Sequence, residues 1–190
     1  MSILTKTPPA TVCIDGEEYE INTDFRIYLS LENIIFDEKM PIQKRIAKIL
    51  SCCYKRLPSS LDGALEALLN FYAGNVCNNN DDKGFKNGRG ERILSFEEDA
   101  DYILSSFLTE YGINLLKEDM HWWEFLALLR GLGQSCRLCE VIKYRTADIS
   151  KIKNKEQRSF YLRQKKLYAL KNTSFEDNDG IFAKNLLKIF

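Results

Sequence analysis

The stretch Ser95–Gly112 reads SFEEDADYILSSFLTEYG and is the clearest helix signal in the chain. Ser95 and Glu98 form a capping box, in which the hydroxyl and the carboxylate each accept a bond from an otherwise unpaired backbone N–H. Gly112 is a typical helix-ending residue. Apolar residues recur at helical spacing between these ends: Phe96, Ala100, Ile103, Leu104, Phe107, Leu108 and Tyr111. The stretch therefore predicts a capped amphipathic helix that buries one face.

Upstream of this helix, residues 11–21 read TVCIDGEEYEI, two short β-prone runs on either side of Asp15-Gly16. Asp-Gly supplies the positive φ angles of a tight hairpin turn, so we predict a β-hairpin over about 10–22. An isolated hairpin is only marginally stable and must lie on helices or on another chain's sheet. Helices are expected over about 24–74: the first is capped by Thr23 or Asp24, the second begins at Pro41, and the third starts after Ser59-Ser60.

Residues 75–94 are rich in Asn, Asp and Gly and predict a mobile loop, which has a role of its own or separates two subdomains. Helices resume over about 95–171, and residues 173–190 are expected to form a tail. We predict a mainly α (α+β) fold: a helical bundle of about five to seven helices with an N-terminal β-hairpin. Residues 1–172 are expected to form a single α-rich domain.

The composition indicates a globular protein that is made and kept in a cytoplasm. The 190 residues are 45% hydrophobic, which supports a real core. No apolar run approaches the ~18 residues of a membrane span, and no signal-peptide stretch opens the chain. A reducing compartment would keep the six cysteines as thiols. They are Cys13, Cys52, Cys53, Cys77, Cys136 and Cys139.

No motif predicts a catalytic residue, a cofactor or a metal site. Cys136-Arg-Leu-Cys139 has the spacing of zinc and redox sites, but no second ligand pair or βαβ context accompanies it. His121 is the only histidine, so the di-iron arrangement suggested by Glu118-x-x-His121 lacks its second motif. No phosphate-binding or nucleophile-elbow motif is present. We therefore expect a protein that is not an enzyme.

Charge is distributed unevenly along the chain. Residues 143–171, here called the basic arm, carry 10 Lys/Arg against Asp148 and Glu156, a net charge of +8. Residues 1–142 carry 15 Lys/Arg against 22 Asp/Glu, a net charge of −7. The arm either binds a protein partner or another copy of the chain, binds nucleic acid through its charges and aromatic rings, or is a solvated helix.

The tryptophans of the segment His121–Phe125 are further candidates, because tryptophan is enriched at interfaces. Adjacent residues point about 100° apart on a helix, so we expect one ring to face the core and the other a neighbouring helix or a partner. The predicted partner-binding residues are Trp122, Trp123, Tyr144, Arg145, Arg158, Tyr161, Arg163, Lys165, Lys166 and Tyr168.

Several segments together resemble one family from tailed phages and prophages of Gram-positive bacteria, the phage gene-product-fifteen family. The matching segments span most of residues 10–170: Ile21–Arg26; Ser95–Ile103 with Phe107 and Tyr111–Leu115; His121–Phe125 with Leu128, Gly131 and Leu132; Tyr144-Arg145 with Asp148-Ile149; and Lys153–Gln157 with Tyr161 and Lys165–Tyr168. The combination is specific, although each piece alone is weak.

The resemblance implies a role in tail morphogenesis. Genes of this family lie just ahead of the tape-measure gene, in the slot of tail assembly chaperones. We therefore expect a chaperone that binds the tape-measure protein, the tail-tube protein or both, and that is a possible homo-oligomer. The alternatives are a structural tail component retained in the virion and a nucleic-acid-binding accessory protein that uses residues 143–171. The resemblance supplies no catalytic residue, and we expect no membrane partner.

Overall fold

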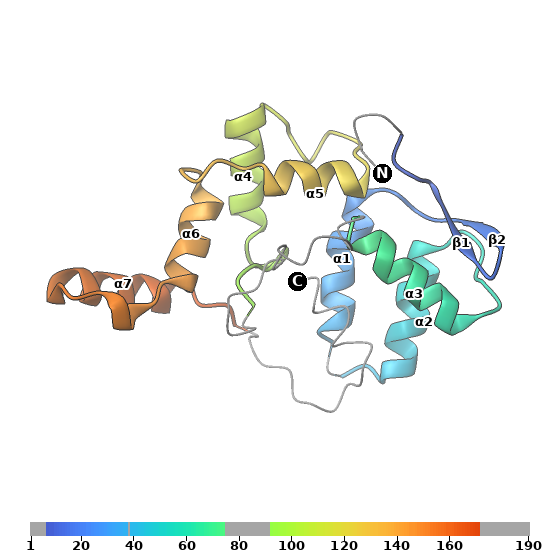
Figure 1. Ribbon diagram of the computed structural model, residues 1–190, viewed down its shortest axis with the longest axis horizontal. Helices are drawn as coiled ribbons and strands as arrows, with labels where there is room; N and C mark the ends of the chain where they lie inside the picture. The colour runs from blue at the N-terminus through green and yellow to red at the C-terminus, as the bar shows by residue number, and fades with distance from the viewer. Residues whose placement is uncertain (1–6, 38, 75–91, 172–190) are drawn as a thin grey trace. The chain divides into compact units, whose positions relative to one another are not determined.

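This computed structural model describes residues 7–37, 39–74 and 92–171. They contain two short strands, seven α-helices and one short 3₁₀ helix (Figure 1). The predicted mainly α fold with an N-terminal hairpin is confirmed. The loop predicted from residue 75 and the tail predicted over 173–190 lie outside the described residues, apart from the loop's last three positions. None of the helices in the described ranges is long and apolar enough to span a membrane.

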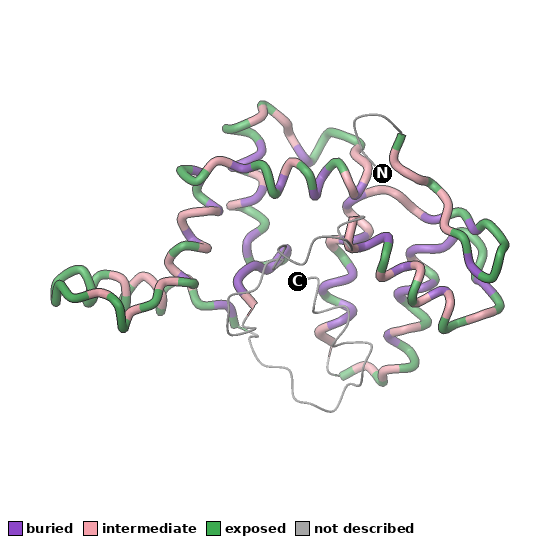
Figure 2. The backbone as a smooth tube through the Cα atoms, viewed as in Figure 1, coloured by how far each residue is buried: buried purple, intermediate pink, exposed green. Residues whose placement is uncertain are grey.

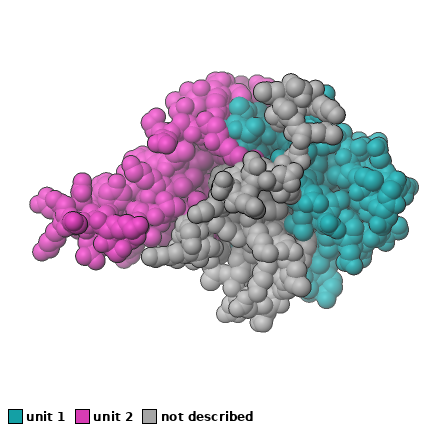
Figure 3. All heavy atoms as spheres, viewed as in Figure 1, with its two compact units in different colours: residues 1–82, 119–128, 177–189 teal, residues 83–118, 129–176, 190 magenta. Residues whose placement is uncertain are grey.

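The chain divides into two compact units, coloured teal and magenta in Figure 3. The described part of unit 1 comprises residues 7–37, 39–74 and 119–128. The described part of unit 2 comprises residues 92–118 and 129–171. Helix α5, Trp122–Arg130, contributes its first residues to unit 1 and its last two to unit 2.

Unit 1 begins with the predicted hairpin. Strand β1, Thr11–Ile14, pairs antiparallel with β2, Glu17–Glu20. The turn residues Asp15 and Gly16 have φ angles of 51° and 84°, the conformation for which the Asp-Gly pair is suited. The hairpin buries Ile14 and Tyr19, and β1 packs against α3. It therefore lies on helices, as its marginal intrinsic stability requires.

The helices of unit 1 begin where their capping residues predict. Helix α1, Phe25–Ile35, is capped by Asp24, whose carboxylate accepts the Arg26 N–H at 2.8 Å. Helix α2, Ile42–Cys53, follows Pro41. Helix α3, Leu61–Tyr72, is capped by the Ser60 hydroxyl, which accepts the Gly63 N–H at 3.2 Å.

The segment at the start of α5 completes the core of unit 1. His121 pairs with Asp24 in an antiparallel bridge, and the Trp122 N–H donates to the Thr23 carbonyl at 2.7 Å. The Trp122 ring is fully buried and lies 5.0–5.1 Å, between centroids, from the rings of Tyr28 and Tyr72. Sequence-distant residues therefore close this core through aromatic packing.

Unit 2 is built on helix α4, Ala100–Tyr111, which buries Ile103 and Phe107 and ends at Gly112 with a φ of 69°. The helix begins later than the capping box predicts, because residues 96–99 form turns. The Ser95 hydroxyl does accept the Glu98 N–H at 3.0 Å. The carboxylate that accepts the Ser95 N–H, also at 3.0 Å, belongs to Asp99 rather than to Glu98.

The remaining elements of unit 2 are helix α6, Arg137–Thr146, the short 3₁₀ helix η1, Ile149–Lys151, and helix α7, Lys155–Leu167. Both α4 and α7 contact α6. Leu138 and Val141 of α6 are buried. The positions 92–94 were predicted as the end of the mobile loop, but Ile93 and Leu94 are buried in this unit.

Candidate functional site

The basic arm, residues 143–171, runs from the second half of α6 through η1 and α7 to the chain that follows α7. Figure 2 shows that α7 has exposed and intermediate residues but no buried one. A 13-residue helix without a buried face has little intrinsic stability in water. Contacts with the rest of unit 2 must therefore hold α7 in place.

Side-chain caps fix where the helices α7 and η1 of the arm begin. The Asn154 side chain accepts the N–H groups of Glu156 and Gln157, both at 2.9 Å, and so begins α7. Asp148 caps η1 by accepting the Ser150 N–H at 3.1 Å. These are the side-chain oxygens that the first turn of a helix requires.

An aromatic cluster attaches α7 to α6. The Tyr144 ring of α6 stacks on the Tyr168 ring at 5.7 Å, with an interplanar angle of 9°. It also meets the edges of Phe160 and Tyr161 at 6.0 and 5.9 Å. The Tyr161 and Tyr168 rings both contact the Tyr144 ring, and all three tyrosines are half-buried, so their main role here is to hold the helix.

Arg137 and Glu140 extend this cluster. The Arg137 guanidinium lies 5.4 Å from the Tyr168 ring centroid and donates to the Tyr168 hydroxyl at 2.6 Å. It also pairs with the Glu140 carboxylate at 2.6 Å, which in turn accepts the Tyr144 hydroxyl at 2.8 Å. The hydrogen bond from Tyr144, followed by that from Arg137, lowers the pKa of Glu140. The carboxylate thus stays ionised while it joins both ends of the cluster.

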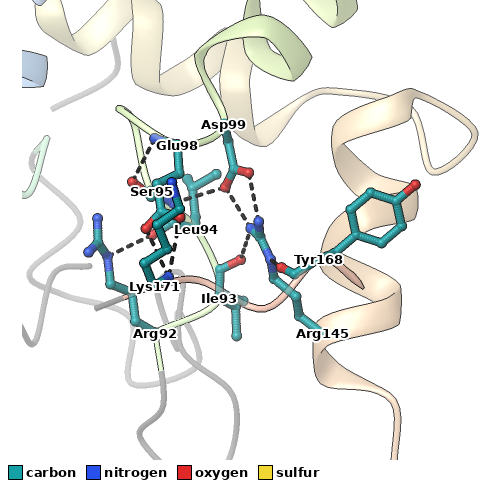
Figure 4. Close-up of polar contacts among 9 residues, drawn as sticks. All are labelled: Arg92, Ile93, Leu94, Ser95, Glu98, Asp99, Arg145, Tyr168 and Lys171. Atoms are coloured by element: carbon teal, nitrogen blue, oxygen red, sulfur yellow. Dashed lines mark hydrogen bonds and ion pairs between the residues drawn. The ribbon is translucent and has the colours of Figure 1, made fainter. Parts of the chain in front are cut away.

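Arg145 anchors the arm to the rest of unit 2 through a buried network (Figure 4). Its two terminal nitrogens donate to the Asp99 carboxylate at 2.6 and 2.7 Å. The same guanidinium donates to the carbonyls of Ile93, at 2.9 Å, and Tyr168, at 2.6 Å. Its planar fork therefore joins three chain segments at once, which a lysine cannot do.

Three further hydrogen bonds in Figure 4 complete the anchor. The Lys171 N–H donates to the two Glu98 carboxylate oxygens at 3.1 and 3.2 Å. Arg92 donates to the Leu94 carbonyl at 2.9 Å, and burial lowers its pKa to about 10. The chain is therefore held on both sides of α7, by Arg145 within α6 and by residues 168–171 beyond the helix.

Two of the predicted partner-binding residues are core residues. Trp122 is fully buried and its indole N–H donates to the Tyr72 carbonyl at 2.9 Å. Arg145 is buried in the network with Asp99. Both side chains are therefore used in packing inside the protein, and their contacts with a partner stay a prediction. Trp123 is half-buried and donates to the Phe71 carbonyl at 2.7 Å, so it covers a neighbouring helix.

The other predicted residues lie on or next to α7. Arg158, Arg163 and Lys166 are exposed. The half-buried ones are Tyr144, Tyr161, Lys165 and Tyr168. Lys165 also donates to the Ala147 carbonyl at 3.4 Å. Counting Arg145, eight of the ten predicted residues therefore lie in unit 2. Three of their cationic side chains are exposed to solvent.

Sequence reasoning missed the apolar part of this surface. Phe160, Leu162 and Leu167 of α7 are 39%, 51% and 67% exposed. The sequence did carry a signal for them: α7 has no apolar face that a core could bury, so its large apolar side chains remain exposed to solvent. The exposed surface of α7 is thus both cationic and apolar.

The cysteine motif has a structural role. The Cys136 sulfur caps α6 by accepting the Cys139 N–H at 3.4 Å. Burial raises the pKa of Cys139 to about 11, which disfavours the reactive thiolate. Among the residues that the structure describes, no cluster of three His, Cys, Asp or Glu side chains is arranged to hold a metal ion.

Comparison with known proteins gives one match. The sequence model of the family described as Bacteriophage Gp15 protein matches residues 4–170, which include the hairpin, all seven helices and the basic arm almost to its end. Neither the curated proteins nor the solved structures give a match.

Proposed function

Because the chain belongs to the Bacteriophage Gp15 protein family, we propose that it is a phage tail morphogenesis protein, a tail assembly chaperone that binds the tape-measure protein. It acts in the cytoplasm of the bacterial host, before the tail tube closes around its partner. The basic arm is the binding surface. The tape-measure protein is the preferred partner, and the tail-tube protein is the second.

One observation carries this proposal: helix α7 has no buried residue and exposes three large apolar side chains among its cations. Exposed apolar groups that gather on one element are typical of interaction sites. A tape-measure protein is long, helical and amphipathic, so its unassembled helices also expose apolar faces. A chaperone for such a protein needs a surface that covers those faces reversibly.

The arm's construction supports a binding role rather than a catalytic one. Arg145 and the aromatic cluster hold the chain at α7, while Leu162 and Leu167 stay exposed. A helix that is held in place before binding loses less conformational entropy when a partner docks. The arm therefore presents a preorganised surface.

Co-expression with the tape-measure protein encoded beside this chain tests the proposal. We expect the tape-measure protein to stay in the soluble fraction and to co-purify with the wild-type chain. A tape-measure protein that is equally insoluble with and without the chain would contradict it. The matched control is K44E/K48E, which changes two exposed lysines of α2 and should leave the complex intact.

Mass spectrometry of purified virions separates a chaperone from a structural tail component. An assembly factor leaves the particle, so we expect no peptides of this chain in mature virions. Stoichiometric presence would instead favour the structural role.

The remaining alternative, nucleic-acid binding, has less support from the arm. Bases stack on open aromatic rings, whereas Tyr144, Tyr161 and Tyr168 are engaged in one cluster.

A further inference from the structure

Within the arm, α7 arranges its exposed side chains in two rows. Phe160, Arg163 and Leu167 are spaced by three and four residues and share one stripe of the helix. Arg158, Leu162 and Lys166 are spaced by four and form a second row. All six residues are exposed, with Phe160 the least exposed of the three apolar ones at 39%. Each row therefore alternates apolar and cationic groups.

Some exposed cations of the described residues are paired with carboxylates, and others, such as Lys44 and Lys48 of α2, are not. Lys55 pairs with Glu20, and Arg137 pairs with Glu140. Arg56 likewise pairs with Glu17. Within the described residues, no ion pair involves the cations of α7: Lys155, Arg158, Arg163, Lys165 and Lys166. Glu156 is the only acidic residue of α7. The helix thus carries a surplus of positive charge that an acidic partner would neutralise.

Helix polarity explains only part of this surplus. Cations in the last turn interact favourably with the negative end of the helix, which accounts for Lys165 and Lys166. Lys155 and Arg158 lie in the first turns, where the same effect is unfavourable to them. Their presence beside Leu162 is better explained by what binds the surface than by the stability of α7 itself.

The chemistry of the two rows identifies the class of partner. We infer that α7 binds an amphipathic helix whose apolar face is flanked by Asp and Glu residues, an inference that rests on the proposed chaperone function. Leu162 buries against the apolar face, and Arg158 and Lys166, which lie about 40° to either side of Leu162 around the helix, pair with carboxylates at its edges. Since the N–H groups of α7 are used within the helix, a partner cannot join it as an added strand.

A nucleic acid fits the same surface less well. Phosphates would pair with the cations, but Leu162 and Leu167 would remain exposed or would lie against a charged backbone. An acidic amphipathic helix satisfies both the apolar and the cationic groups. This segment of the partner is therefore expected to be helical when bound and acidic along both edges of its apolar face.

A peptide titration tests the inference. The probe is a fluorescein-labelled peptide of about 20 residues, with Leu at every third or fourth position and Glu on the flanks, followed by fluorescence anisotropy. The comparison peptides are a scrambled sequence of the same composition and a version with Lys in place of Glu. A labelled single-stranded DNA oligonucleotide is the fourth ligand.

We expect the acidic amphipathic peptide to bind the wild-type chain and the K44E/K48E control equally. The variant R158E/R163E/K166E should bind about 10-fold or more weakly, because three attractive contacts become repulsive. L162S/L167S should also weaken binding while it leaves the salt dependence in place. Circular dichroism at 222 nm checks that each variant keeps its helix content.

Three results would overturn the inference. The scrambled peptide could bind as tightly as the amphipathic one, which would leave only a charge effect. The oligonucleotide could bind more tightly than the peptide, which would indicate a nucleic-acid surface. The peptide could bind all four proteins with one affinity, which would place its site away from α7.

The same variants separate this inference from the chaperone proposal. A tape-measure complex that forms with R158E/R163E/K166E as well as with the wild type would overturn the α7 surface and leave the chaperone function standing. Failure to form any tape-measure complex, together with α7-dependent peptide binding, would overturn the chaperone function and support the surface.

Discussion

The Arg145 guanidinium and the Asp99 carboxylate form a doubly bonded ion pair inside unit 2, with nitrogen–oxygen distances of 2.6 and 2.7 Å. Both residues are almost completely shielded from solvent. The pair joins α6 to the turn before α4, and Arg145 extends the connection to the Tyr168 carbonyl after α7. A buried charge that loses its partner is costly, so this pair makes a sharp prediction about stability.

R145A and D99A are each expected to lower the free energy of unfolding by about 3–5 kcal/mol, because each leaves an uncompensated group in the interior. R145K should lose most of the same energy, since an ammonium lacks the planar fork. Urea unfolding followed by far-UV circular dichroism measures these losses. The exposed Arg158 supplies the control: R158A should change stability by less than about 0.5 kcal/mol. A comparable small effect for R145A would contradict the anchoring role.

The two tryptophans should respond differently to truncation. W122A removes a fully buried ring and is expected to cost about 3–5 kcal/mol. W123A removes a half-buried ring and its bond to the Phe71 carbonyl, for an expected loss of about 1–2 kcal/mol. Thermal melts of both variants compare the losses. Equal losses would show that the two rings are not divided between core and surface as described.

The stability of unit 1 should depend on pH through His121. Its Nδ1 accepts the Trp123 N–H at 3.0 Å and so caps α5, and its Nε2 lies 3.1 Å from the Pro9 carbonyl. Burial lowers the pKa of His121, opposed by the bond to Pro9 and the charge of Glu124. The folded protein thus resists protonation more than the unfolded chain does.

The sign of the effect follows from that difference. Above the unfolded pKa of about 6.5, both states are neutral and the stability is at its full value. As the pH falls from there toward the lower folded pKa, the unfolded state binds more protons and the free energy of unfolding decreases. Urea titrations between pH 7.5 and 5 should record this decline.

The variant H121N is the matched control for this pH effect. Asparagine is a good helix-capping residue and does not titrate, so H121N should keep most of the stability and lose the decline. An equal decline in H121N would assign the pH dependence to other groups.

Much of the fold was predictable because its signals are local. The Asp15-Gly16 turn, the caps Asp24 and Ser60, and the helix end at Gly112 each depend on a few neighbouring residues. Asp99 was missed because Glu98 also fits the capping pattern, and only the packing of unit 2 decides between them. A turn that buries Asp99 beside Arg145 cannot be deduced from sequence spacing alone.

The site was predicted in position but not in detail. The charge count located the basic arm, and the structure then divided its residues by burial. Arg145 looked like one more surface cation, although its partner lies 46 residues away in the chain. Phe160, Leu162 and Leu167 were not among the predicted partner-binding residues, and only the structure shows that they are exposed. Tertiary packing, which local patterns do not encode, decides both cases.

The accessibility of the cysteines gives a further test of the description. Cys13 is exposed, whereas Cys53 is buried and burial raises its pKa to about 12. Since the thiolate is the reacting form, a brief pulse of iodoacetamide on the native protein should label Cys13 and spare Cys53. Peptide mass spectrometry reads out each position. Early labelling of Cys53 without unfolding would contradict its place in the core.

The most direct test of the central claim is site-specific photo-crosslinking in cells that also make the tape-measure protein. A photo-reactive phenylalanine analogue replaces Leu162 on α7 and, in the control, Lys48 on α2; both positions are exposed. We expect a crosslinked product with the tape-measure protein from position 162 and none from position 48. A product from position 48 but not from position 162, or from neither, would contradict the claim that α7 is the chaperone's binding surface.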